Sequence, residues 1–255
     1  MENDPFEIVD EIPRKVMTIF YLVDTSGSMS GAKIGALNTA VRETLPIIEE
    51  ISTNNPDSKI KIAVLEFSSR CEWMYPTPID VTSFEWRDLQ AGGLTSLGGA
   101  YDNLSQKLSQ SHGFMKEATG SFAPVIILLS DGAPTDQTEY ALDKLKANNW
   151  FKVATKVAIA IGDDCVKSTL IDFTGNEEAV LTVHNVDELK KVIRMVSVTA
   201  SRVNSKNTSA GKDAPDKATE TINTIQTDIA NDPTLKGIDV GNSTANAGTD
   251  VWSGW

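Results

Sequence analysis

The 255-residue sequence has little of the chemistry on which several protein classes depend. It contains two cysteines, too few for a disulfide scaffold. Its 23 lysines and arginines are outnumbered by 35 acidic residues, which gives a net charge of −12. A field of this sign repels phosphate, so we expect neither nucleic acids nor anionic membranes as partners.

Long apolar runs are also missing. The longest apolar stretches, around residues 16–23 and 124–129, are far shorter than the roughly 20 residues of a membrane-spanning helix. The first five residues, Met1-Glu2-Asn3-Asp4-Pro5, are acidic and contain no apolar core of a secretory signal. These features predict a soluble protein located in the cytoplasm.

The composition of the chain changes near residue 204. Apolar and amphipathic runs alternate over residues 14–203, whereas residues 204–255 are rich in small polar side chains and hold four lysines against seven acidic residues. So polar a segment buries little apolar surface. We therefore predict an N-terminal extension (1–13), one folded domain (14–203) and a polar, flexible C-terminal tail (204–255).

Two features of the tail depart from that description. Ile222, Ile225 and Ile229 recur at helical spacing, which predicts a short amphipathic helix over residues 218–231. Trp252 and Trp255 are the tail's only aromatic residues. Because large apolar side chains are unfavourable in water, these two tryptophans suggest a docking motif for a partner or for the protein's own body.

The domain itself shows strand and helix patterns in alternation. A continuous apolar run indicates a strand buried on both faces, and apolar residues three and four apart indicate a helix. The predicted strands are 16–24, 59–68, 72–79, 124–130, 156–162 and 179–183, and the predicted helices are 31–52, 96–109, 137–149, 166–173 and 186–204. The segment 72–79 suits a sheet edge, since it contains prolines. This order predicts a doubly wound, Rossmann-like α/β fold with a mostly parallel sheet and helices on both faces.

Oxygen-bearing side chains cluster where predicted strands end. Asp24, Ser26 and Ser28 follow the first strand, Asp131 follows the strand over 124–130, and Thr95 lies in a glycine-rich loop that opens a helix. Each loop alone is also typical of a turn with a helix cap. Together, at one edge of a parallel sheet, they predict a metal site. Hydroxyl and carboxylate oxygens favour Mg²⁺, with Mn²⁺ or Ca²⁺ as alternatives.

The same residues carry a resemblance to a known family. Asp24-x-Ser26-x-Ser28, Gly93-x-Thr95-x-Leu97 and the segment 128–132 are similar to the metal-ion-dependent adhesion site of von Willebrand factor A domains, and the resemblance covers about residues 14–203. It implies that the hydroxyls of Ser26, Ser28 and Thr95 ligate the cation, and that Asp24 and Asp131 ligate it directly or through water. The tail lies outside the resemblance.

A narrower resemblance concerns the opening Ile-Phe-Tyr-Leu-Val-Asp-Thr-Ser-Gly-Ser-Met and the loop Asp-Gly-Ala-Pro-Thr-Asp. Both are similar to the cytosolic bacterial TerY-like proteins associated with tellurium resistance. That group implies a stress-resistance or phospho-signalling complex in which a protein kinase and a phosphatase act beside the domain. In such a system Thr219, Thr221, Thr224 and Thr227 are candidate phosphoacceptors, and a solvated linker is the alternative.

Binding rather than catalysis is the favoured interpretation of the site. Neutral hydroxyls transfer little charge to a cation, which therefore attracts an Asp or Glu carboxylate of a protein partner. The alternative is a Mg²⁺-dependent phosphohydrolase of the haloacid-dehalogenase type, which needs a second acid two residues after its nucleophile. That position holds Ser26, and the nearest lysine is Lys33, outside the loops. We therefore expect no enzyme activity, and a scaffold with phosphorylated tail threonines is a further alternative.

Overall fold

The computed structural model describes residues 14–115, 120–206 and 214–241. No helix within these ranges is both long and apolar enough to cross a membrane. A single eight-stranded sheet runs through the centre of the molecule in the order β3-β2-β1-β5-β6-β7-β8, and β4 also pairs with β2. The strands are β1 (Lys15–Asp24), β2 (Ser58–Phe67), β3 (Cys71–Trp73), β4 (Ile79–Asp80), β5 (Val125–Ser130), β6 (Thr155–Ile161), β7 (Val180–Val183) and β8 (Asp239–Val240).

The central strands of the sheet are parallel and the edge strands are antiparallel. β1 pairs in parallel with β2 and β5, and β5-β6-β7 continue in parallel. β3, β4 and β8 run antiparallel to their neighbours. The α/β fold with a mostly parallel sheet, predicted from the alternation of strand and helix patterns, is confirmed.

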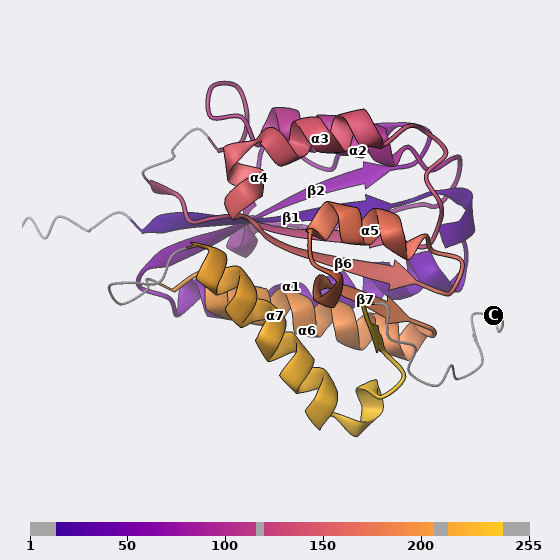
Figure 1. Cartoon of the computed structure of the whole chain (residues 1–255). Helices are drawn as coiled ribbons and strands as arrows, with labels where there is room; N and C mark the ends of the chain where they lie inside the picture. Colours follow the sequence, from indigo (N-terminus) through magenta and orange to yellow (C-terminus); the bar gives the residue numbers. More distant parts are fainter. Residues whose placement is uncertain (1–13, 116–119, 207–213, 242–255) are drawn as a thin grey trace, which may run out of the picture.

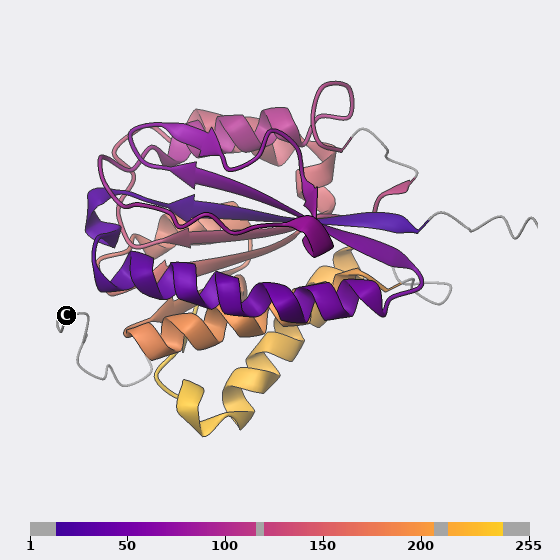
Figure 2. The same cartoon turned by 180° about the vertical axis from the view of Figure 1, so that it is seen from behind.

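Within the described ranges, seven helices cover both faces of this sheet (Figures 1 and 2). One hydrophobic cluster joins the sheet to α1 (Ala32–Thr53), α6 (Val186–Asn204) and α7 (Ala214–Asn231). A second cluster joins the other face to α2 (Leu97–Lys107), α3 (Glu139–Ala147), α4 (Asn149–Val153) and α5 (Lys167–Thr174). Tyr21 of β1 faces the first cluster and Leu22 the second, as the two-residue period of a strand requires. Both faces of β1 are therefore buried.

One predicted strand is wrong in its extent. The segment 72–79 forms two short edge strands, β3 and β4, and not one continuous strand. Pro76 and Pro78 lie in the interruption. Because proline has no amide hydrogen, it cannot donate to a strand ladder, and the pairing with β2 resumes only at Ile79.

The prediction of a flexible tail over residues 204–255 is wrong for residues 214–241. α7 begins four residues before the predicted start of the helix and packs against α6 and β6. Ile222, Ile225 and Ile229 are buried there, and β8 adds a strand to the sheet beside β7. A few apolar residues at helical spacing are thus enough to pack the segment against the domain, although its average composition is polar. The extension 1–13 and the pair Trp252 and Trp255 lie outside the described residues.

A buried polar network fixes α7 to the end of α6. Asn204 accepts a hydrogen bond from Thr155 Oγ1 at 2.8 Å and donates to Thr221 Oγ1 at 3.1 Å. Lys217 Nζ donates to the Asn204 carbonyl at 3.2 Å, and burial lowers the pKa of this lysine. A buried network in which each polar group has a partner specifies one packing arrangement.

Candidate metal centre

The candidate site lies where the chain reverses its direction across the sheet. From β1 the chain proceeds to β2 on one side, and it later returns to form β5 on the other side of β1. Loops that leave adjacent parallel strands in opposite directions open a crevice at the carboxyl ends of those strands. Asp24 is the last residue of β1, and Ser130 is the last residue of β5.

Asp24 is held rigidly in this crevice. Its carboxylate accepts the Ser26 amide at 2.8 Å through Oδ1 and the Ser130 hydroxyl at 2.6 Å through Oδ2. Burial raises the pKa of Asp24, these hydrogen bonds act in the opposite direction, and the nearby charge of Asp131 adds to the increase. The folded chain thus keeps a carboxylate where its negative charge is disfavoured.

The other predicted oxygens lie around the same point. Ser26 Oγ and Ser28 Oγ are 3.0 Å apart, and Ser28 Oγ donates to Asp131 Oδ1 at 2.7 Å. A Cβ atom added at Gly132 would lie 3.6 Å from both Ser28 Oγ and Thr95 Oγ1, so the third loop passes closely between these hydroxyls. The structure therefore brings together all five residues that the sequence singled out.

Backbone hydrogen bonds hold the three loops against one another. Gly27 N–H donates to the Gly93 carbonyl at 3.0 Å, and Thr135 N–H donates to the Thr95 carbonyl at 2.9 Å. Gly93 has a φ of 87°, and a Cβ there would lie 2.6 Å from Ser69 Oγ, so this position requires glycine. The site is a preformed arrangement of loops on a rigid sheet edge.

Two further residues complete the site, and sequence reasoning did not assign them a role. Lys33, in the first turn of α1, donates from Nζ to Asp131 Oδ2 at 2.7 Å. Asp136 accepts the Gly98 and Gly99 amides at 3.1 and 3.0 Å, where the N-terminus of α2 favours a negative charge. Asp136 thereby fixes the start of the helix that follows Thr95. The signal for Lys33 was its place on the helix directly after the Asp-x-Ser-x-Ser loop.

The residues present fit a hard divalent cation. The described part of the chain holds no group of three or more His, Cys, Asp or Glu side chains suited to a metal, so any ion here depends on hydroxyl oxygens. Asp24 and Asp131 are buried carboxylates that repel each other. Asp131 already attracts one positive charge, the ammonium of Lys33 at 2.7 Å. Hydroxyl and carboxylate oxygens are ligands of Mg²⁺, Mn²⁺ and Ca²⁺.

Comparison with known proteins agrees with this geometry, since the family described as von Willebrand factor type A domain matches residues 18–195. The chain belongs to this family. The von Willebrand factor type A protein from Catenulispora acidiphila aligns with a TM-score of 0.55 and 17% identity, covering 74% of this chain and 43% of that chain. Proximal thread matrix protein 1 from the mussel byssus, with a zinc-occupied MIDAS motif, aligns with a TM-score of 0.54 and 20% identity, covering 72% and 48%.

Two curated relatives are chains of collagen VI. The collagen alpha-5(VI) chain of Homo sapiens is 26% identical over 186 residues, which are 71% of this chain and 7% of that protein. The collagen alpha-6(VI) chain of Mus musculus is 28% identical over 146 residues, 54% of this chain and 6% of that protein. The chain therefore spans a small fraction of these relatives, and the likeness concerns one domain.

The candidate phosphoacceptors of the tail differ in accessibility. Thr219 and Thr227 of α7 are exposed, and Thr224 is half-buried. Thr221 is fully buried and donates to the Lys217 carbonyl at 2.8 Å, so a kinase cannot reach it in the folded chain. The other three remain accessible to modification.

Proposed function

We propose that this von Willebrand factor A domain is a non-enzymatic module that binds a protein partner through a divalent cation. Asp24, Ser26, Ser28, Thr95 and Asp131 would hold the ion, most simply Mg²⁺. When bound, the ion supplies a positive centre that accepts an Asp or Glu carboxylate of the partner. The observation that carries the proposal is the convergence of three neutral hydroxyls and two carboxylates at the switch point of the sheet.

The protein's own residues explain why such an ion would attract a ligand. Asp24 already accepts hydrogen bonds on both oxygens, and hydroxyl ligands contribute no formal charge. The cation would therefore keep much of its positive charge. Ser28 is exposed while Asp24 and Asp131 are buried, so the site faces solvent on the Ser28 side. A partner carboxylate can approach from that side.

An affinity purification with and without chelator tests the proposal. The full chain is used as bait with Mg²⁺ or with EDTA, beside Asp24→Ala and a control variant, Asp102→Ala. Asp102 is an exposed carboxylate of α2 that pairs with Lys144 at 2.9 Å. We expect partners that are retained by the wild type and by Asp102→Ala in Mg²⁺, and lost in EDTA and in Asp24→Ala. Partners that bind equally in all conditions would overturn the proposal.

One observation favours a second candidate function, a Mg²⁺-dependent phosphohydrolase. Lys33 lies outside the loops in sequence, but its ammonium contacts Asp131, where it could also hold a phosphate oxygen. Ser26 still occupies the position of the required second acid. Turnover of a phosphate-ester panel, lost in Asp24→Ala, would establish this function, and absence of turnover with intact Mg²⁺ binding would exclude it.

The cellular setting is proposed from the sequence resemblance to TerY-like proteins. We place the domain in the cytoplasm of a bacterium, in a tellurium-resistance or related stress complex with a protein kinase and a phosphatase. Thr219, Thr224 and Thr227 are the phosphoacceptors this proposal predicts. Mass spectrometry after co-expression with a cognate kinase should find phosphate on at least one of them, and an unmodified α7 would contradict this proposal.

A further inference from the structure

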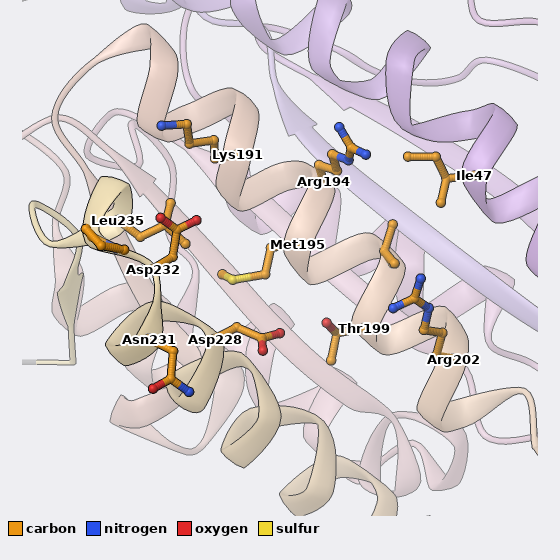
Figure 3. Close-up of a pocket in the computed structure, with 12 residues that line it drawn as sticks. Ile47, Lys191, Arg194, Met195, Thr199, Arg202, Asp228, Asn231, Asp232 and Leu235 are labelled. Carbon is orange, nitrogen blue, oxygen red and sulfur yellow. The ribbon is translucent and has the colours of Figure 1, made fainter.

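A groove of about 640 Å³ runs between α6, α7 and the turn at Pro233–Leu235 (Figure 3), and none of the residues that line it belongs to the candidate metal centre. Met195, Val198 and Leu235 supply apolar surface, and Ile47 of α1 lies at its border. This volume lies within the range of about 300–1,000 Å³ that is usual for ligand-binding pockets. The groove is therefore large enough to take aromatic side chains.

Three cations line the α6 side of the groove. Lys191, Arg194 and Arg202 are exposed, and none of them forms a salt bridge with any residue in the described ranges. Three cations along one helix, beside apolar surface, are unusual on a chain of net charge −12, although Lys191 does lie near Asp232, whose pKa is lowered by hydrogen bonds from Thr234 and also by the charge of Lys191. This combination suits an extended segment that carries an acidic residue and large apolar side chains.

The opposite wall limits how acidic that segment can be. Asp228 and Asp232 line the groove from α7 and from the start of the turn. Asp232 is already engaged, because its carboxylate accepts the Thr234 amide and hydroxyl at 2.8 and 2.7 Å. A segment with a single acidic residue meets the cations of α6 without placing several negative charges against α7.

We propose that residues 250–255 of this chain, Asp-Val-Trp-Ser-Gly-Trp, occupy this groove. Trp252 and Trp255 would cover the apolar surface, and Asp250 would lie beside the cations of α6. These residues are outside the described part of the chain, and residues 242–255 contain Asp250 as their one charged side chain.

Reach supports this occupant. The groove is lined by Leu235, six residues before Gly241, the last described residue. Nine extended residues from Gly241 to Asp250 span up to about 30 Å, whereas the helix from Lys191 to Arg202 is about 16 Å long. A segment tethered so close has a high effective concentration at the groove, which favours it over a second copy or another protein.

Hydrogen exchange of the full chain, read by mass spectrometry, tests the proposal. The wild type is compared with the double variant Trp252→Ala/Trp255→Ala and with the control Ser253→Ala. We expect several-fold faster exchange in peptides covering 191–202 and 228–235 in the double variant, and no change in the control. Equal exchange in all three chains would overturn the proposal.

A second variant probes the groove from its other side without touching the core. Arg194→Glu/Arg202→Glu reverses two exposed charges, and it should speed exchange in residues 250–255 several-fold while β1 and β5 peptides stay unchanged. Both effects must be independent of protein concentration between low and high micromolar. Protection that grows with concentration would show that a second copy, and not the chain's own segment, fills the groove, and would overturn the proposal.

Discussion

At the scale of single residues, the site is defined by charge that the fold buries. Asp24 lies at the end of a strand buried on both faces, and it faces a second carboxylate, Asp131. Burying a carboxylate is unfavourable unless hydrogen bonds or a cation compensate for the lost water. A carboxylate that is buried beside a second carboxylate is the clearest residue-level sign of a cation site.

Replacing Asp24 with asparagine should separate metal binding from folding. Asparagine keeps the acceptor for Ser26 N–H, and its amide can donate to Ser130 Oγ. Burial raises the pKa of Asp24 in the folded chain. In chelator, the free energy of unfolding of the wild type therefore falls as the pH rises from about 4, the pKa of an unfolded Asp, to the folded-state pKa of Asp24. At higher pH it stays at that lower value. In chelator at pH 7 we expect Asp24→Asn to be more stable than the wild type, because it removes a buried charge, and to show no increase in Tm with Mg²⁺.

Thermal unfolding in EDTA and in Mg²⁺, repeated between pH 4 and pH 8, measures both effects. A variant that is less stable in EDTA would show that the Asp24 charge is structural. A variant that still gains stability from Mg²⁺ would show that Asp24 is not needed to hold the ion.

Lys33 should weaken metal binding, because its ammonium competes for Asp131 Oδ2. Removing one positive charge at this distance changes the affinity for a cation by several-fold to about tenfold. We expect Lys33→Met to bind Mg²⁺ more tightly than the wild type in calorimetric titration, with Lys144→Met, an exposed lysine on α3, as the control. Weaker binding in Lys33→Met would mean that the lysine orients Asp131 for the ion.

The two thiols should be inert. Burial raises the pKa of Cys165 to about 12, with the charges of Asp131 and Asp24 adding to it. Burial raises the pKa of Cys71 to about 11. Since the thiolate is the reactive form, iodoacetamide at pH 8 should label the folded chain very slowly and the urea-unfolded chain at both cysteines. Rapid labelling of the folded chain would contradict this account.

At the scale of elements, β1 and β5 position the chemistry. Their register pairs Val23 with Leu129, so the residues that follow, Asp24 and Ser130, meet at the same level of the sheet. The first turn of α1 places Lys33 beside the loop after β1, and α2 begins two residues after Thr95. The donors therefore depend on the ends of secondary-structure elements, which a rigid sheet holds in place.

The helix α7 should contribute to the stability of the fold. Ile225 is buried against the first hydrophobic cluster, and truncating a buried isoleucine to alanine costs about 2–4 kcal/mol. We expect Ile225→Ala to lower the free energy of unfolding in urea by that amount. The control Thr227→Ala, exposed on the same helix, should change it by less than about 0.5 kcal/mol. Equal effects of the two substitutions would mean that α7 is only loosely attached and does not stabilise the fold.

The sequence allowed prediction of what is local or strongly periodic. The strand ending at Asp24 and the helix that ends at Asn204 have unmistakable patterns, and parallel topology then forces Asp24 and Asp131 together. It did not reveal Lys33 on Asp131, because that contact depends on the direction in which a long side chain extends from α1, which no sequence pattern specifies. It also missed β8, a two-residue edge strand, since so short a strand has no period and is specified only by pairing with β7.

At the scale of the whole molecule, the charge of −12 shapes how partners approach. An acidic surface repels an acidic partner at long range. A divalent cation at the strand ends would create one local positive centre on that surface, and the cations along α6 form a second, made of other residues. The two candidate binding regions therefore call for different ligands, a carboxylate at the ion and an aromatic segment at the groove.

Calorimetric titration of the full chain with Mg²⁺ is the most direct test of the central claim, that hydroxyls and carboxylates at the ends of β1 and β5 hold one cation. The wild type is compared with Ser28→Ala/Thr95→Val, which removes two hydroxyls and keeps both carboxylate charges. The account predicts one saturable site in the wild type and at least tenfold weaker binding in the variant, about 1.4 kcal/mol. No saturable binding in the wild type, or equal affinity in the two proteins, would contradict it.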